Sequence, residues 1–309
     1  MIYVDNTILS AIAKCTTRGI LRYGLGMTTA EEFATLQCGS SWHKAMELYL
    51  RGETYTDVLR NFEDTYAEWS NSNVPLGHRL EYSNVLTIMD QWLYDHPLAN
   101  APYVVPGPDF VECGFAYPLD ETGEIMYVGR YDAAVVDKQS GDWYVLDHKT
   151  TGWINQEKVN KYQLDSQMSG YIWALQQQVP EPVGGAYINM IELKKLPSDA
   201  KRKCKVHGVV YAECGPLHAE SQIFIVERTP QQIEQWKRTA IALATRYKYN
   251  LRITQENGGL DFVPELPIQG AFNGSCEWCE FKQLCTMGKP VELMHSNLIY
   301  QPWEPYRLE

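Results

Sequence analysis

The chain has 309 residues, of which 45% are hydrophobic and 21% are charged, and this composition excludes a mainly disordered protein. Its formal net charge of −11 excludes a protein that coats nucleic acid through bulk positive charge, although a local basic groove stays compatible with it. No apolar run approaches the roughly 20 residues that a membrane-spanning helix needs. The N-terminus has no basic region before an apolar stretch, so we expect no secretory signal and a cytoplasmic location. Eight cysteines in such a chain indicate thiols or metal ligands rather than disulfides.

The first hundred residues predict helices. Apolar and basic residues alternate at helical spacing over residues 7–24, and Gly39, Ser40 and Ser41 are typical of a cap before a helix that starts at Trp42. Further helices are expected over residues 54–70 and 79–95.

The pattern changes after Asn100, where runs of β-branched and aromatic residues are separated by glycine and proline. We expect strands over residues 110–118, 126–137 and 143–148, a helix over 155–175, strands over 186–193, 205–212 and 223–227, and a helix from Pro230 to about Tyr249. This order predicts an α/β fold, with a central mixed sheet flanked by helices. We expect a single domain, made of a helical N-terminal part (1–105), a core (106–250) and a cysteine-containing tail (251–309).

Two carboxylates and a lysine fall on neighbouring strands of this sheet. Side chains alternate between the faces of a strand, so Asp147 and Lys149 share one face, while the His148 side chain points to the other and its backbone carbonyl stays available. Asp132 lies on the preceding strand. Such oxygen ligands suit Mg²⁺ or Mn²⁺, and Lys149 could position a water or offset charge on a phosphate. A single Asp-x-Lys on a strand is, however, more often part of a solvated face.

Asp132 with Asp147-His148-Lys149 resembles the motif of the PD-(D/E)XK nuclease superfamily, in its RecB-like branch. The resemblance implies a restriction-endonuclease-like core and metal ligands from His43, Asp132, Asp147 and the carbonyl of His148. It also implies that Gln167 and Tyr171, which fit the Q-x-x-x-Y motif of the branch, orient Lys149 and contact DNA. The chain departs from the pattern in having Tyr131 rather than proline before Asp132. Alternatively, His43 simply pairs with Glu47, one helical turn away.

Three cysteines near the C-terminus, Cys276, Cys279 and Cys285, have the spacing C-x2-C-x5-C, and Cys15 lies 261 residues before the first of them. Four thiolates can hold either a zinc ion or an iron–sulfur cluster, and the residues alone leave both open. The layout is similar to that of AddB and the CRISPR-adaptation nucleases, which implies a 4Fe–4S cluster that ties the two ends of the chain together. The other cysteines, at positions 38, 113, 204 and 214, show no metal spacing and are expected to pack in the core.

A basic stretch over residues 194–205 lies between two predicted strands. As an exposed arm it could contact phosphates through Lys194, Lys195, Lys201, Arg202 and Lys203, and a solvated loop is the equally plausible alternative. Lys14, Arg18 and Arg22 form a second basic group near Cys15. Tyr162 and Trp173 could stack on bases of a single strand, but burial in the core is the expected role of each.

The resemblance therefore implies a metal-dependent deoxyribonuclease, acting as an exonuclease on single-stranded DNA or DNA ends in recombination, repair or CRISPR adaptation. Its partners would be DNA and a recombination or CRISPR-adaptation protein, with no membrane. A bacterial cell, or a phage in its bacterial host, would be its setting. Two alternatives stay open: a catalytically silent DNA-binding or scaffold protein of the same fold, and a zinc-stabilised nuclease acting on RNA.

Overall fold

The computed structural model describes residues 1–29, 33–195, 203, 208–210 and 220–304. The chain forms two compact units. Unit 1 comprises Met1–Glu31, Gly114–Arg130 and Thr229–Glu309, and unit 2 comprises Glu32–Cys113 and Tyr131–Arg228. The strands β4 (Val111–Pro118) and β5 (Ile125–Asp137) each pass from one unit to the other along the chain.

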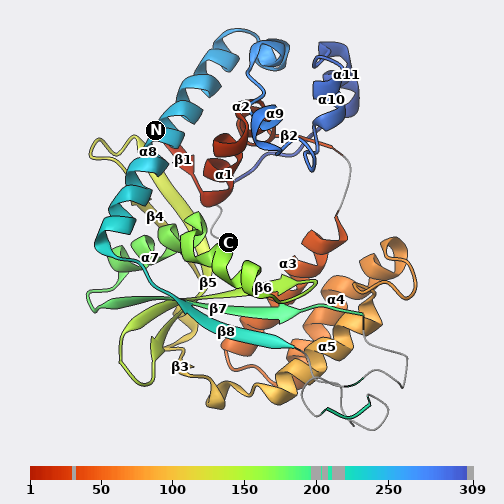
Figure 1. Cartoon of the computed structure of the whole chain (residues 1–309), viewed down its shortest axis with the longest axis vertical. Helices are drawn as coiled ribbons and strands as arrows, with labels where there is room; N and C mark the ends of the chain where they lie inside the picture. Colours follow the sequence, from red (N-terminus) through yellow and green to blue (C-terminus); the bar gives the residue numbers. More distant parts are fainter. Residues whose placement is uncertain (30–32, 196–202, 204–207, 211–219, 305–309) are drawn as a thin grey trace. The chain divides into compact units, whose positions relative to one another are not determined.

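Unit 2 contains a mixed sheet, as the sequence predicts. Its strands run in the order β5, β6 (Trp143–Thr151), β7 (Val183–Glu192) and β8 (Ser221–Val226), and β3 (Tyr103–Val104) pairs with the end of β5 (Figure 1). β6 is antiparallel to β5 and parallel to β7, and β8 is antiparallel to β7. The connection from β6 to β7 is helical, which is the usual way to join parallel strands.

Helices pack against this sheet. α3 (Ala34–Leu50), α4 (Tyr55–Asn73) and α5 (Tyr82–Asp95) lie side by side (Figure 1) and bury a core that includes Trp42, Phe62 and Trp92. α7 (Ser166–Gln178) contacts β6 and β7. Shorter helical segments of this unit are Leu98–Asn100, Pro108–Phe110, α6 (Gln156–Lys161) and Tyr162–Leu164.

Two predicted helices of unit 2 differ in the structure. The helix expected to start at Trp42 begins at Ala34 instead, because Cys38 and Trp42, one turn apart, are both fully buried and continue one apolar face through the predicted cap. The helix expected over residues 155–175 is broken. Asp165 accepts hydrogen bonds from the backbone N–H groups of Gln167 and Met168 and so starts α7 as a separate helix. The strand expected over residues 205–212 falls mostly outside the described residues.

Unit 1 brings together the two ends of the chain. β1 (Ile2–Val4) is parallel to the first half of β5, and β2 (Met27–Thr28) pairs with β9 (Ile299–Tyr300). Its helical segments are α1 (Asn6–Lys14), α2 (Thr16–Gly19), the π-helical Ile20–Gly24, α8 (Pro230–Glu256), Gly259–Glu265, α9 (Gly270–Asn273), α10 (Lys282–Thr286) and α11 (Val291–Asn297).

Side-chain caps explain where the helices α1 and α8 of unit 1 begin. The side chain of Asp5 accepts from the N–H of Ile8 at 2.7 Å and begins α1, which ends where Cys15 takes an extended conformation. Thr229 and Gln232 form a capping box at the start of α8. The predicted helix over residues 7–24 is therefore interrupted at Cys15.

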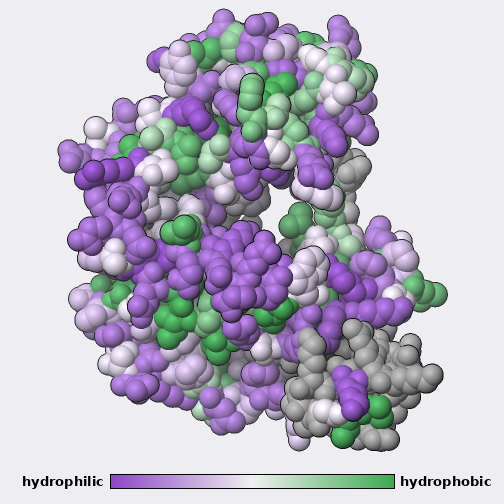
Figure 2. Space-filling model, in the orientation of Figure 1, coloured by the Kyte–Doolittle hydropathy of each residue, from purple (hydrophilic) through white to green (hydrophobic). Residues whose placement is uncertain are grey.

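Hydrophilic residues predominate on the face of the molecule drawn in Figure 2. Within the described ranges, no helix combines the length and the apolar character that crossing a bilayer requires.

Candidate functional site

The antiparallel pair β5–β6 sets the geometry of the candidate active site. Ala133 pairs with Leu146 in this ladder, so continuing the register by one residue places Asp132 opposite Asp147 on the same face. The Oδ2 atom of Asp132 accepts a hydrogen bond of 2.6 Å from the backbone N–H of His148. Because the N–H and carbonyl of one strand residue point to the same side, the His148 carbonyl is expected at the same edge of β6.

Lys149 is held at the site by two oxygen atoms. Its Nζ donates to Oδ1 of Asp147 at 3.0 Å and to Oε1 of Gln167 at 3.0 Å. The Nε2 atom of Gln167 in turn donates to the hydroxyl of Tyr171 at 3.0 Å. Gln167 and Tyr171 lie on the same face of α7. Gln167 contacts Lys149 directly, and Tyr171 contacts Gln167.

His43 reaches the site from α3. Its Nδ1 lies 3.0 Å from Oδ1 of Asp132. Glu47, the alternative partner of His43, instead pairs with Arg51 at 3.0 Å. The structure therefore brings His43, Asp132, Asp147, Lys149 and Gln167 into one connected group.

Burial and neighbouring charges give the carboxyl groups of Asp132 and Asp147 different pKa values. Burial raises the pKa of Asp147 to about 6 against the opposing effect of Lys149, and the side chain is only 2% exposed. Burial also disfavours the charge on Asp132, but His43, His148 and Lys149 outweigh it and lower the pKa of Asp132 to about 2. Asp147 and Asp132 raise the pKa of Lys149 against its burial, so the lysine stays charged. Two opposed carboxyl groups with separated pKa values are typical of a site for acid–base or metal chemistry.

One carboxylate oxygen of this group lies against the lysine without a hydrogen bond. The Oδ2 atom of Asp147 is buried and lies 2.9 Å from Nζ of Lys149, outside hydrogen-bond geometry, and it has no hydrogen-bond partner within the described part of the chain. Carboxylate and carbonyl oxygens with an imidazole match the donor set that Mg²⁺ or Mn²⁺ accepts. The types of donor present therefore suit a hard divalent ion, although no three His, Cys, Asp or Glu side chains in the described part of the chain are arranged to hold one.

The His148 side chain lies on the opposite face of β6, as strand alternation predicts. It is fully buried, its Nδ1 is 3.0 Å from Nδ2 of Asn189, and the edge of its ring meets Trp92. Burial lowers its pKa to about 4, so the ring is neutral at neutral pH. Only the backbone of His148 faces the carboxylates.

Arg228 supports the start of α7, a role that no sequence pattern indicates. Its guanidinium donates to the hydroxyl of Ser169 at 2.8 Å and to the backbone carbonyls of Tyr162 and Asp165 at 2.9 and 3.2 Å. Since Gln167 lies within this segment, Arg228 helps to fix the residue that positions Lys149. A single arginine between a strand and a helix has no motif by which it could have been found.

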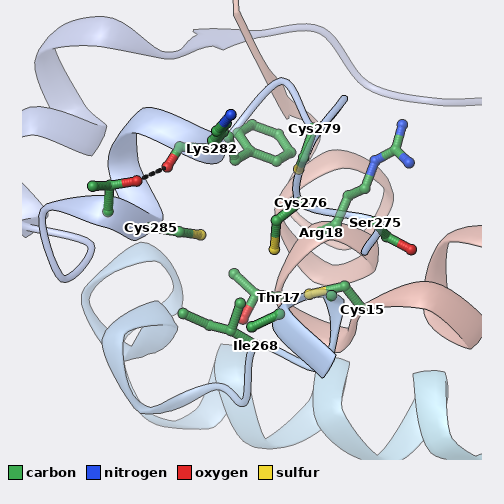
Figure 3. Close-up of a pocket in the computed structure, with 13 residues that line it drawn as sticks. Cys15, Thr17, Arg18, Ile268, Ser275, Cys276, Cys279, Lys282 and Cys285 are labelled. Carbon is green, nitrogen blue, oxygen red and sulfur yellow. Dashed lines mark hydrogen bonds between the residues drawn. The ribbon is translucent and has the colours of Figure 1, made fainter. Parts of the chain in front are cut away.

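The four candidate cysteines line one cavity in unit 1. Cys15, Cys276, Cys279 and Cys285 surround a space of about 270 Å³, and the sulfur of Cys276 is directed into it (Figure 3). All four are free thiols. Cys15 lies at the break between α1 and α2, so the interruption of the predicted helix is what places its side chain at this cavity.

Hydrogen bonds hold the two segments that carry these cysteines together. The N–H of Thr16 donates to Oε1 of Gln269 at 2.8 Å, and Nε2 of Gln269 donates to the Thr16 hydroxyl at 3.0 Å. Asn273 donates to the carbonyl of Lys14 at 2.9 Å. Within the C-terminal segment itself, the buried ammonium of Lys289 donates to the carbonyls of Val263 and Leu266 at 3.0 and 2.6 Å.

The thiols are also close enough to affect each other electrostatically. Burial, followed by the negative charges of Cys279 and Cys15, raises the pKa of Cys285 to about 11. A cationic metal group in this cavity would offset the repulsion between the thiolates, because its positive charge favours the deprotonated form of each thiol that it binds. The donor set and the cavity fit a thiolate-held metal group, although no three His, Cys, Asp or Glu side chains among the described residues are arranged to hold a single ion.

The predicted basic surfaces are only partly as expected. Lys194 is held between Glu220 and Glu192, at 2.5 and 3.8 Å, rather than standing free on an arm. Lys195 and Lys203 are exposed, and Lys201 and Arg202 lie outside the described residues. In unit 1, Arg18 pairs with Glu280 at 3.5 Å and Arg22 donates to the carbonyl of Gln301 at 2.9 Å.

Two further side-chain expectations can be compared with the structure. Trp173 is only 6% exposed, as expected of a core residue, and this burial excludes it from stacking on bases, whereas Tyr162 is half-buried. Cys38 and Cys113 are buried, as expected of packing residues, and the cysteines at positions 204 and 214 are outside the described residues.

A mixed sheet that presents two opposed carboxylates beside a positioned lysine defines a class of metal-dependent phosphodiester-cleaving enzymes. A family model of the PD-(D/E)XK nuclease superfamily matches residues 7–286, and the chain belongs to this superfamily. Membership implies a nuclease, and members typically use Mg²⁺ or Mn²⁺. No curated protein matches the chain. Among solved structures, the crystal structure of SSO0001 is similar at 12% identity and a TM-score of 0.33, covering 82% of this chain and 95% of that one.

Proposed function

We propose that this protein is a metal-dependent deoxyribonuclease that hydrolyses phosphodiester bonds at the ends of DNA or in single strands. The observation that carries the proposal is the convergence of Asp132, Asp147 and Lys149 on one face of the sheet, with Gln167 on the lysine. A catalytically silent relative would have no need to keep a buried carboxyl group, a charged lysine and its positioning helix together.

The residues of the chain have distinct parts in this proposal. Asp132, Asp147, the carbonyl of His148 and the ring of His43 would hold Mg²⁺ or Mn²⁺. When bound, such an ion lowers the pKa of a water molecule and offsets negative charge on the phosphate. Lys149, held by Asp147 and Gln167, would donate hydrogen bonds to a phosphate oxygen or orient the attacking water. Tyr171 acts through Gln167, so it is a positioning residue.

We further propose that Cys15, Cys276, Cys279 and Cys285 hold a 4Fe–4S cluster. Support comes from their common cavity, which offers room for a group larger than one ion, and from the C-x2-C-x5-C spacing. The cluster would fasten the N-terminal and C-terminal segments of unit 1, which already share hydrogen bonds. Its part would be mainly structural.

The similarity to RecB-like nucleases supports an exonuclease with a place in recombination, repair or CRISPR adaptation, working with DNA and a protein of one of these processes. We propose that both units belong to one nuclease, because β4 and β5 run through both and the family match spans them. An RNA-cleaving, zinc-stabilised enzyme is the competing hypothesis.

The test of activity uses purified full-length protein with 5′- and 3′-labelled single strands, duplexes with overhangs, circular single strands and RNA of the same sequence. We expect cleavage of linear DNA with Mn²⁺ or Mg²⁺, none with EDTA, and none by Asp147→Asn. Cleavage of circular strands would show an endonuclease. A preference for RNA would show that RNA rather than DNA is the substrate. If no substrate is cleaved, the result favours a catalytically silent scaffold protein.

The test of the metal group uses anaerobically purified protein. A broad absorbance near 400 nm with about four iron and four sulfide per chain supports the cluster. Stoichiometric zinc without iron would overturn it and leave the nuclease proposal untouched.

A further inference from the structure

Trp153 is a large aromatic residue that lies outside the core, directly after β6. Its side chain is 59% exposed. The ammonium of Lys158 lies 3.9 Å from the centre of its ring and also donates to the hydroxyl of Thr151. The hydroxyl of Thr151 donates to the carbonyl of Trp153 at 3.1 Å. These contacts fix an indole that nonetheless leaves much of its surface to solvent.

Positive charge is concentrated around this indole. The guanidinium carbon of Arg79 lies 3.4 Å from the position that a Cβ atom would take on Gly152, and Lys161 follows Lys158 by three residues on α6. Arg79 and Lys161 both lower the pKa of Lys158, in addition to its burial, while Glu192 opposes them. In a chain with a net charge of −11, an ammonium over an exposed tryptophan, with two further cations near that ammonium, forms a local site for an anion.

The position of this group relates it to the active site. Asp147, Lys149 and Thr151 occupy alternate positions of β6 and therefore share one face. Thr151 is two residues beyond Lys149, about 6.6 Å along the strand. The hydrogen bonds of Thr151 with Lys158 and Trp153 place the indole and its cations at the end of the face that carries the catalytic lysine.

We propose that Trp153 is a stacking platform for an unpaired base next to the cleaved phosphodiester, and that Lys158 and Arg79 contact the adjoining phosphate. The proposal rests on the nuclease function proposed above and deepens it. A base can cover an indole face only when it is out of the duplex, so this residue favours single strands and frayed ends over paired DNA. Stacking is tolerant of sequence because every base has a π-face.

The test measures binding of a labelled 12-nucleotide single strand by fluorescence anisotropy, with Ca²⁺ in place of Mn²⁺ to prevent cleavage and at one fixed salt concentration. Trp153→Ala should weaken binding about 10-fold, since stacking on an aromatic side chain is typically worth about that factor or more. Trp153→Phe should restore most of it. Tyr94→Ala removes an aromatic side chain of unit 2 that is 73% exposed and should leave binding unchanged.

An abasic nucleotide moved along the strand provides a readout that a merely structural role would not change. In the wild-type protein, one position should weaken binding about as much as Trp153→Ala does. In Trp153→Ala, the same abasic position should have little further effect. Equal sensitivity of both proteins to that position would overturn the inference.

Failure of the inference and failure of the proposed function are distinguishable. If the wild-type protein neither binds nor cleaves nucleic acid, the proposed function is wrong. If the wild-type protein cleaves and Trp153→Ala binds as tightly, only the stacking platform is wrong. Should Trp153→Ala lose its fold by circular dichroism, Trp153→Leu, which keeps apolar bulk without a π-system, takes its place with the same expected loss.

Discussion

The Oε1 atom of Gln167 lies 3.0 Å from Nζ of Lys149 and accepts a hydrogen bond from it. This contact joins the helix α7 to the face of β6 that carries Asp147 and Lys149, so the orientation of the lysine depends on where α7 begins. Asp165 caps that helix and Arg228 holds the segment before it. The candidate active site is therefore fixed by a helix start as much as by the strands.

Replacing Gln167 should slow cleavage without unfolding the protein. We expect Gln167→Ala to lower kcat by about 100-fold, because a misplaced catalytic group costs about that much. Tyr171→Phe removes only the hydroxyl that orients the Gln167 amide, so its effect should be smaller. Steady-state kinetics measure both, with the exposed Gln163→Ala as control. A larger effect of Tyr171→Phe than of Gln167→Ala would contradict this order.

Asp147→Ala should abolish cleavage, by about 1,000-fold or more, because it removes an expected ligand of the divalent ion. Asp147→Asn keeps the shape of the side chain, so it should keep the fold, and it is expected to lose as much activity as Asp147→Ala. Isothermal titration with Mn²⁺ should show weakened binding. Asp64→Asn, on the exposed side of α4, is the matched control. Activity near that of the wild type would place the metal site elsewhere.

Removal of Arg228 should destabilise the protein. Its guanidinium makes three hydrogen bonds around the start of α7, and we expect Arg228→Ala to lower the free energy of unfolding by about 1–2 kcal/mol. Arg238→Ala, on the exposed face of α8, removes only a surface ion pair and should change little. Urea unfolding compares the two, and equal effects would show that Arg228 has no special role.

Cys279→Ser should lower the iron content and the melting temperature together, because binding of a thiolate-held metal group is coupled to folding. Cys113→Ala removes a buried cysteine outside the cavity and should leave the iron content unchanged. Iron analysis and thermal unfolding are the measurements. An unchanged melting temperature in Cys279→Ser, with iron lost, would mean that the group does not stabilise unit 1.

Stability should depend on pH through Asp137. A hydrogen bond from the Tyr187 hydroxyl, followed by one from the N–H of Ser140, lowers the pKa of Asp137 to about 2. A lowered carboxyl pKa stabilises the fold above the ordinary value near 4, and this contribution is lost as the pH falls toward 2. The stability difference between the wild type and Tyr187→Phe should therefore shrink between pH 5 and pH 3. Urea unfolding across that range would refute the link if the difference stayed constant.

Much of the candidate site follows from local sequence. Alternation along a strand places Asp147 and Lys149 on one face and the His148 ring on the other, and the structure agrees. Helical spacing puts Gln167 and Tyr171 on one face of α7. The mixed sheet is predictable too, because its strands and helices are marked by period and by turn residues.

Other features were decided by tertiary structure. The α3 helix extends back to Ala34 because burial of Cys38 outweighs a local cap. The sequence by itself determined which side chains share a face, since periodicity involves only neighbours along the chain. The resemblance to a known family already implied that Cys15 meets the three C-terminal cysteines, and the folded chain added the cavity that they line. Only the folded chain decided that Arg228 holds α7, because such a contact depends on packing between segments whose spacing in sequence carries no information about their distance in space.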